Sequence, residues 1–234
     1  MERLDKLFSL SMILTRKEFK KAVKDKRISV NGVILTNSDI KIDENIDVVM
    51  LDSTVVNLTK YIYIMLNKPL GVVSSTYEKN EKTVLDIIPK EYLRRDLFPC
   101  GRLDKDTTGL IILTNDGEST HKNLSPKNNI EKRYYFELEN NLSNSSKTKL
   151  EAGVTLQDST KTKECSIDMI DSKKGYITIT EGKYHEIRRM FAYVSNKVLV
   201  LKRLSFKGIE LDSSLKEGES RLLTDDEIKI FKGL

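Results

Sequence analysis

The chain has 234 residues, and its 40 Lys and Arg against 35 Asp and Glu give a formal net charge of +5. With 38% hydrophobic and 32% charged residues, the composition is typical of a folded globular protein of one or two domains. The first residues, MERLDKLFSL, lack the apolar stretch of a signal peptide, and no run reaches the length of a membrane span. We therefore expect a cytoplasmic protein without a membrane partner, whose mild positive charge permits a polyanionic partner without requiring one.

Residue types that hold metals and cofactors are scarce in this chain. Cys100 and Cys165 are its two cysteines and form no CxxC pair, and His121 and His185 are its two histidines. The sequence therefore indicates neither a disulfide framework nor a zinc site. It contains no GxxxxGK[ST] or GxGxxG segment that would indicate ATP or a dinucleotide. We expect the protein to act without a metal or a cofactor.

The first sixty residues predict a small basic module. Leu4, Leu7 and Phe8 have helical spacing, and a second helix is predicted after Thr15, which forms a capping box with Glu18. The polar face of this second helix carries a dense set of cations: Arg16, Lys17, Lys20, Lys21 and Lys24. From the residues alone, this face is either an ordinary solvated surface or a surface for a polyanion.

The order of helix, basic helix and hairpin resembles the S4 RNA-binding module. The hairpin is predicted by Asn31-Gly32, because both central residues of a type I′ turn need positive φ. The resemblance implies that the basic helix binds RNA phosphates without reading sequence. Polar residues replace the periodic pattern at 52–60. We therefore expect an S4-like domain over residues 1–56 and a second domain over residues 61–234.

The second domain is predicted to be rich in strands. Segments with β patterns are YIYIMLNKPLG (61–71), which ends in a Pro-Gly turn, GLIILT (109–114), EKRYYFELE (131–139), YITIT (176–180) and VLVLKRLSFKGIEL (198–211). Helices are predicted for YHEIRRMFAYVS (184–195) and for LTDDEIKIF (223–231), which has a capping box between Thr224 and Glu227. The expected fold is α+β: a small helix-helix-hairpin domain followed by a mixed, mostly antiparallel sheet with flanking helices.

Three places in the second domain could carry chemistry. Asp104 stands at the entrance of a predicted buried strand, where it is either a turn cap or a reactive carboxylate held rigid by the sheet. Tyr134 shares a face with apolar residues, so it is either a core side chain or a ring that stacks on a nucleobase. At about 100° per residue, Arg188 flanks the apolar face of its helix and can reach a half-buried carboxylate, with a structural salt bridge as the alternative. Arg189 points away, toward solvent or an RNA phosphate.

Four segments of the second domain follow one another in a recognisable order: LNKPLGVVSS, GRLDKDTTGLIILTNDG, EKRYYFELE and EGKYHEIRRMF. Behind an S4-like module they resemble, over essentially the whole chain, the pseudouridine synthases of the RsuA type. The resemblance implies an enzyme that isomerises a uridine in RNA, detaching the uracil at N1 and rejoining it through C5 after the nucleotide leaves the helical stack. The pair Tyr184-His185 is closer to the 16S rRNA enzyme than to the 23S rRNA relatives.

The resemblance also implies roles for individual residues. Asp104 would attack the ribose C1′ or remove a proton from C2′, and Arg188 would pair with it and keep it charged. Tyr134 would pack on the uracil and assist proton removal from C5. The implied RNA or pocket contacts are Arg102, Ile187, Arg189 and the five cations of the basic helix. Glu186 stands where the family usually has Gln, and this second carboxylate could compete for Arg188.

The expected partner is ribosomal RNA or a small-subunit assembly intermediate, bound by a monomer. The predicted target is a uridine of 16S rRNA, of the uridine-516 type. One alternative is an enzyme for a 23S rRNA uridine, and another is a non-catalytic RNA-binding factor for ribosome assembly. The trio Asp104, Tyr134 and Arg188 favours the enzyme, because a binding protein has no need of all three.

Overall fold

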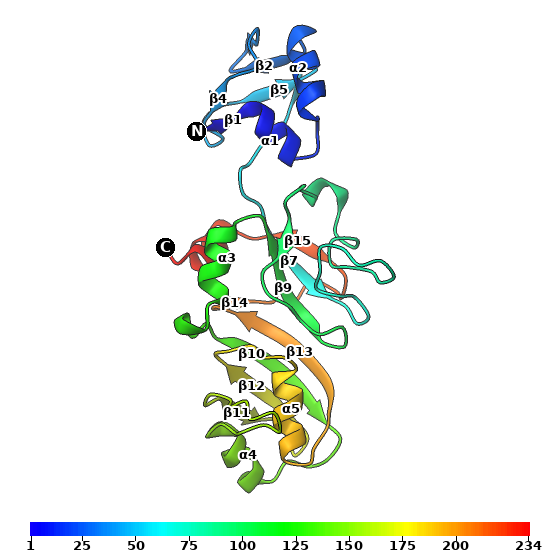
Figure 1. Cartoon of the computed structure of the whole chain (residues 1–234), viewed down its shortest axis with the longest axis vertical. Helices are drawn as coiled ribbons and strands as arrows, with labels where there is room; N and C mark the ends of the chain where they lie inside the picture. The colour runs from blue at the N-terminus through cyan, green and yellow to red at the C-terminus, as the bar shows by residue number, and fades with distance from the viewer. The chain divides into compact units, whose positions relative to one another are not determined.

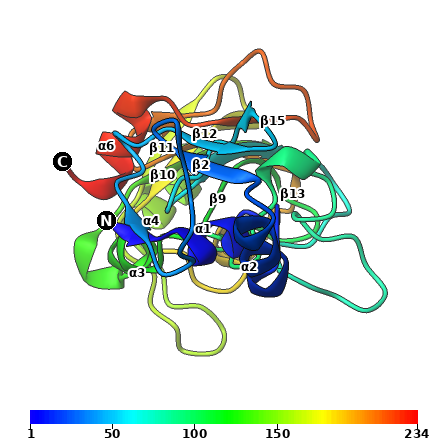
Figure 2. The ribbon, with the colours of Figure 1, turned by 90° about the horizontal axis from the view of Figure 1, so that it is seen from above.

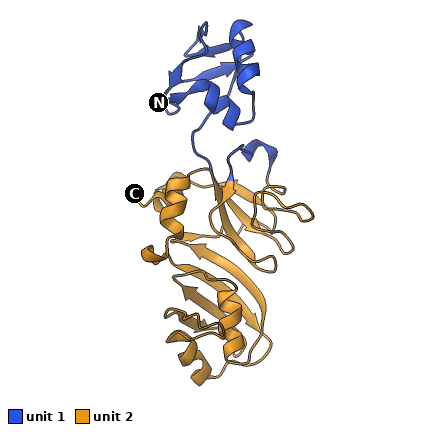
Figure 3. Ribbon diagram, viewed as in Figure 1, with its two compact units in different colours: residues 1–62, 89–97 blue, residues 63–88, 98–234 orange.

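The computed structural model describes all of residues 1–234. It divides into two compact units, one of residues 1–62 with 89–97 and one of residues 63–88 with 98–234 (Figure 3). None of its helices combines the length and the apolar character that a membrane crossing requires. Each unit is described separately below.

The first unit contains the predicted helix pair and hairpin. Its elements are β1 (Glu2–Arg3), α1 (Leu4–Leu10), α2 (Arg16–Lys24), β2 (Ile28–Val30), β3 (Val33–Ile34), β4 (Lys41–Ile42), β5 (Val49–Leu51), β6 (Thr54–Val55) and η1 (Lys90–Tyr92). Helices α1 and α2 lie side by side (Figures 1 and 2), and the rings of Phe8 and Phe19 join them at 5.1 Å between centroids.

Local sequence signals explain where these elements begin. Glu18 N–H donates to Thr15 Oγ1 at 3.2 Å and Thr15 N–H donates to Glu18 Oε2 at 2.8 Å, so the predicted capping box is confirmed. Asn31 and Gly32 have φ values of 51° and 80°, as the predicted hairpin between β2 and β3 requires. Strands β3, β2, β5 and β6 form an antiparallel sheet in that order.

The second unit is a nine-stranded sheet with helices on its flanks (Figure 1). Its strands are β7 (Tyr63–Lys68), β8 (Phe98–Pro99), β9 (Thr108–Thr114), β10 (Lys132–Leu138), β11 (Ser166–Met169), β12 (Lys174–Ile179), β13 (Val198–Phe206), β14 (Ile209–Glu210) and β15 (Ser220–Leu222). Its helices are α3 (Gly117–Leu124), η2 (Pro126–Asn128), α4 (Asn144–Glu151), α5 (Glu186–Tyr193) and α6 (Asp225–Lys232).

The sheet order is β11-β12-β10-β13-β9-β7-β15, with β14 added beside β13 and β8 beside β9. Every pairing is antiparallel except that of β13 with β9. The predicted α+β class with a mixed, mostly antiparallel sheet is therefore confirmed.

Burial along the strands follows the sequence patterns. All seven residues of β9 are buried, as expected for an unbroken apolar run, whereas β10 buries alternate residues. Helix α5 buries Ile187, Met190 and Phe191, and the Phe191 ring lies 4.8 Å from that of Phe136 on β10. The packing of α5 against the sheet thus fixes the orientation of this helix, and with it the position of Arg188, the catalytic candidate that it carries.

Two helix starts are informative. Helix α5 begins at Glu186, two residues later than predicted, because His185 adopts a left-handed conformation with φ 47°. Helix α6 has the predicted capping box, in which Glu227 N–H donates to Thr224 Oγ1 at 3.3 Å and Thr224 N–H donates to Glu227 Oε2 at 2.7 Å.

Gly109 allows the one parallel contact of the sheet. It lies opposite Arg203 in the β9–β13 pairing and has a φ of +99°. An added Cβ would overlap the carbonyl oxygen of Arg203 and lie 2.7 Å from its backbone nitrogen. A side chain at this position would therefore push apart the two central strands beside the candidate site.

Candidate active site

Asp104 lies in the loop that connects β8 to β9, and hydrogen bonds on both sides of it fix that loop. Ser74 Oγ donates to the carbonyl of Leu103 at 2.9 Å and accepts from its N–H at 3.0 Å. The N–H of Thr107 donates to the carbonyl of Asp104 at 3.0 Å and closes a tight turn. The Asp104 side chain remains 29% exposed, so a carboxylate is presented from a rigid loop.

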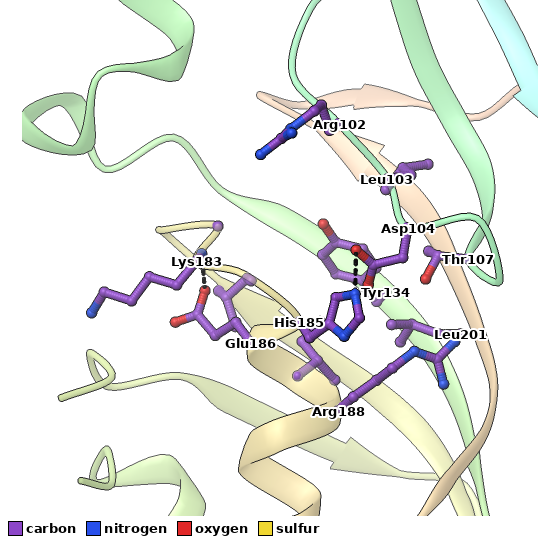
Figure 4. Close-up of a pocket in the computed structure, with 13 residues that line it drawn as sticks. Arg102, Leu103, Asp104, Thr107, Tyr134, Lys183, His185, Glu186, Arg188 and Leu201 are labelled. Carbon is purple, nitrogen blue, oxygen red and sulfur yellow. Dashed lines mark hydrogen bonds and ion pairs between the residues drawn. The ribbon is translucent and has the colours of Figure 1, made fainter. Parts of the chain in front are cut away.

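His185 is the side chain that faces Asp104 (Figure 4), a contact that the sequence did not predict. Its Nε2 lies 3.5 Å from Asp104 Oδ1. His185 has a left-handed backbone conformation and immediately precedes α5. Its ring stacks on that of Tyr184, with 4.0 Å between centroids and 15° between planes.

Tyr134 lies beneath Asp104 in the same view, on the buried face of β10 (Figure 4). It is 7% exposed, and burial raises the pKa of its phenol, while the charge of Arg203 acts in the opposite direction. Arg203 lies opposite Tyr134 in the β10–β13 pairing, is 3% exposed, and its Nε donates to the carbonyl of Leu110 at 2.6 Å. A buried cation thus lies opposite the candidate tyrosine in the sheet and acts on the pKa of its hydroxyl.

Arg188 is paired with Asp106 rather than with Asp104, and the expected pairing with Asp104 was wrong. Its Nη2 lies 3.0 Å from Asp106 Oδ2 and donates to the Asp106 carbonyl at 2.9 Å, while Nη1 donates to the carbonyl of Val198 at 3.0 Å. Arg188 flanks the apolar face of α5 as expected, but its guanidinium binds Asp106 and the carbonyl of Val198 instead of Asp104. It therefore ties the Asp104 loop and the start of β13 to one helix.

The remaining residues that the family resemblance implied as RNA or pocket contacts are spread over both units. Ile187 is buried and lines the pocket, and Arg102 is exposed at its edge. Arg189 does not face solvent freely, because it forms an ion pair with Asp158 and donates to the carbonyl of Tyr184 at 3.2 Å. The five cations of α2 are all exposed in the first unit, and Arg16 lies 3.9 Å from Asp5.

Glu186 pairs with Glu181 and not with Arg188, as expected for residues two apart on a helix, which point in different directions, so this second carboxylate does not compete for Arg188. Both residues are buried, and a hydrogen bond joins their carboxyl groups. Burial and the neighbouring carboxylate raise the pKa of Glu186, which also accepts the N–H of Lys183 at 2.9 Å (Figure 4). Lys183 Nζ at 2.8 Å and the N–H of Lys163 at 2.7 Å hold Glu181 in the charged form.

These residues enclose two adjoining spaces. The reaction pocket is a cavity of about 70 Å³ whose lining includes Asp104, Tyr134, His185, Ile187 and Arg188. The outer cavity, of about 770 Å³, shares the first three of these residues and extends to the segments 73–75 and 124–126. Its lining carries more cations than carboxylates: Arg102, Lys105, Lys132, Lys183 and Arg203 against Glu78, Asp104 and Glu181. Such a lining suits an anionic ligand.

Lys132 is a second buried cation that the sequence did not assign to the site. It lies two residues before Tyr134 on the buried face of β10, and its Nζ donates to the carbonyl of Ile130 at 2.7 Å. Burial, followed by the charge of Arg203, lowers its pKa to about 8. No three His, Cys, Asp or Glu side chains gather in the structure as a metal site would require.

Known proteins of one kind share this sequence and fold. Residues 62–193 match the family model of RNA pseudouridylate synthases. An uncharacterized RNA pseudouridine synthase of Bacillus subtilis is 39% identical over 98% of each chain. The ribosomal small subunit pseudouridine synthase A of Escherichia coli is 36% identical over 97% of this chain and 98% of its own. A crystal structure of a pseudouridylate synthase superposes with a TM-score of 0.69, at 34% identity, over 99% of this chain and all of the other.

The chain belongs to the RNA pseudouridylate synthase family. It is an RNA pseudouridine synthase of the RsuA type, an isomerase, as the four sequence segments indicated.

Proposed function

We propose that this enzyme isomerises one uridine of 16S rRNA, of the uridine-516 type, with Asp104 as its catalytic residue. The observation that carries the proposal is the position of Asp104, presented from a rigid loop into a pocket beside Tyr134 and at the edge of a cation-lined cavity. Relatives named ribosomal small subunit pseudouridine synthase A match nearly the whole chain, which supports the small subunit as the target.

The reaction needs no net change in atoms or electrons. The N1–C1′ bond of the uridine breaks, the uracil turns, and a C5–C1′ bond forms, while C5 loses a proton and N1 gains one. The Asp104 carboxylate begins the reaction either by attacking C1′ or by removing the C2′ proton. Both routes require a carboxylate that reaches one face of the ribose, and the partly exposed side chain of Asp104 suits this requirement.

Tyr134 and Arg203 would act together on the uracil. With its pKa raised by burial, the Tyr134 phenol is neutral in the free enzyme and offers its ring as a stacking surface. This oxygen can remove the C5 proton only as a buried phenolate, after its own proton has passed to solvent, and it becomes the neutral phenol again when it takes the C5 proton. The positive charge of Arg203, which acts to lower the pKa of Tyr134, would stabilise that phenolate.

Arg188 would act on the reaction through position. By holding the backbone and side chain of Asp106, it fixes the turn that begins at Asp104. The loss of this tie would let the carboxylate drift from the ribose, and small displacements of a reacting group cost large factors in rate. In the first unit, the exposed cations of α2 would bind RNA backbone, in keeping with the S4-like order of its elements.

The experiment that tests the proposal maps pseudouridine in 16S and 23S rRNA from cells lacking this protein, complemented with the wild type or with Asp104→Asn. We expect one 16S site to be lost, and restored only by the wild type. The loss of a 23S site would overturn the choice of subunit. If no site is lost from either rRNA, ribosomal RNA is not the substrate and the proposed target falls, and restoration by Asp104→Asn would overturn the role of Asp104.

A further inference from the structure

Tyr184 is an aromatic side chain held in the open at the edge of the site. It is 73% exposed, and its ring is stacked on that of His185. The loop that carries it is fixed on both sides, since Arg189 donates to the Tyr184 carbonyl at 3.2 Å and the Lys183 N–H donates to Glu186 at 2.9 Å. A large ring fixed in this way cannot withdraw from water by itself, so burial has to come from a ligand.

Tyr184 lies outside the pocket in which the reaction is proposed to occur. The reaction pocket includes His185 but not Tyr184, whereas the outer cavity includes both. His185 therefore has two neighbours: Asp104, 3.5 Å from its Nε2, and the ring of Tyr184. A uracil placed for reaction at Asp104 and Tyr134 leaves the Tyr184 ring available to another group of the same RNA.

We propose that Tyr184, backed by His185, stacks on the base of a nucleotide adjacent to the target uridine. The inference rests on the proposed function and names a second base subsite in it. The occupant is an RNA nucleotide, because a planar base matches the open ring, and the surplus of cations in the lining of the outer cavity, which Tyr184 shares with Arg102 and Lys105, suits the phosphates. Because every base has a π-face, this subsite holds the displaced strand without selecting its sequence.

Tyr77 provides a matched control for Tyr184. It is 75% exposed in the same unit, and it lines neither the reaction pocket nor the outer cavity. Tyr184→Ala is expected to raise KM for a short 16S rRNA hairpin by roughly 5- to 100-fold with little change in kcat. Tyr184→Phe, which keeps the ring, and Tyr77→Ala are expected to behave as the wild type. Removing a ring removes no charge, so the salt dependence of RNA binding should not change.

A binding assay tests the stack without turnover. The hairpin carries 2-aminopurine on the 5′ or the 3′ side of the target uridine and is bound by Asp104→Asn enzyme, with or without Tyr184→Ala. We expect fluorescence at one of the two positions to be quenched on binding, and the quenching to be lost with Tyr184→Ala.

Equal KM values for Tyr184→Ala and Tyr77→Ala, or quenching that persists without the Tyr184 ring, would overturn the subsite. The failure of the proposed function has a different signature, namely no pseudouridine formed by the wild type in the same hairpin. If the wild type does not bind this hairpin, both proposals fall.

Discussion

Glu186 gives the sharpest test of how the loop beside Asp104 is held together. The pKa of Glu186 is raised in the folded protein. At a pH between the ordinary glutamate pKa and this raised pKa, the folded protein therefore holds a proton that the unfolded chain releases. Stability from this group is therefore complete below the ordinary glutamate pKa and is lost as the pH rises through the folded pKa. The free energy of unfolding should fall by about 1.4 kcal/mol for each pH unit in that window.

Glu186→Gln removes the titration and keeps the geometry. The amide nitrogen can donate to Glu181 as the protonated carboxyl does, and the amide oxygen can accept the N–H of Lys183. At mildly acid pH the variant should match the wild type to within about 1 kcal/mol, the net value of one hydrogen bond. At pH 8 the variant should be the more stable of the two, because the wild type has lost its proton.

The measurement is denaturant unfolding of both proteins at intervals from pH 5 to pH 8. The exposed residue Glu164, in the Glu164→Gln variant, serves as the control and should not alter the slope of stability with pH. Parallel curves for wild type and Glu186→Gln, or a variant that is less stable at pH 8, would refute the shared proton between Glu181 and Glu186.

Three further predictions concern other parts of the chain. Gly109→Ala should destabilise the second unit by about 2–4 kcal/mol in denaturant unfolding, because β9 and β13 must separate. The control is Gly117→Ala, where an added Cβ meets nothing within 4 Å, and it should cost under about 1 kcal/mol. Equal costs for the two variants would contradict the close approach of β13 to Gly109. Asp106→Asn removes the ion pair of Arg188 but leaves its hydrogen bonds to backbone carbonyls in place, so kcat should fall by less than about fivefold. Arg188→Ala removes both and should lower kcat further. Equal falls in kcat would show that the ion pair carries the whole effect. Changing three lysines of α2 to Glu (Lys17, Lys20 and Lys21) should weaken RNA binding and flatten its salt dependence in filter-binding assays, and an unchanged slope would mark this face as ordinary solvated surface.

The fold was largely predictable because its strands and caps carry local signals. The unbroken apolar run of β9, the alternation of β10 and the capping boxes at Thr15 and Thr224 each depend on residues a few positions apart. The late start of α5 was not predictable in this way. Nothing in YHEIRRMF shows that His185 takes a left-handed conformation, since that depends on its surroundings in the fold.

Side-chain partners were harder to predict than positions. Periodicity placed Arg188 beside the apolar face of α5, but the choice of Asp106 over Asp104 depends on how the turn of residues 104–107 meets the helix. Arg203 and Lys132 did leave a signal in the sequence, since each falls on the buried face of an alternating strand. A charged side chain in such a position needs a partner, and here the partners are backbone carbonyls, that of Leu110 for Arg203 and that of Ile130 for Lys132.

The parallel contact at Gly109 also sets the time at which the enzyme can form during protein synthesis. The Asp104 loop leads into β9, but the neighbour of that strand on one side is β13, and α5 closes the pocket from residues 186–193. At about 5–20 residues per second, the ribosome needs roughly 5–20 s after residue 104 to reach residue 203. During that interval Thr108 and Gly109 of β9 lack their β13 partner and the pocket around Asp104 lacks the residues of α5, so the candidate site of a nascent chain stays incomplete until synthesis is nearly finished.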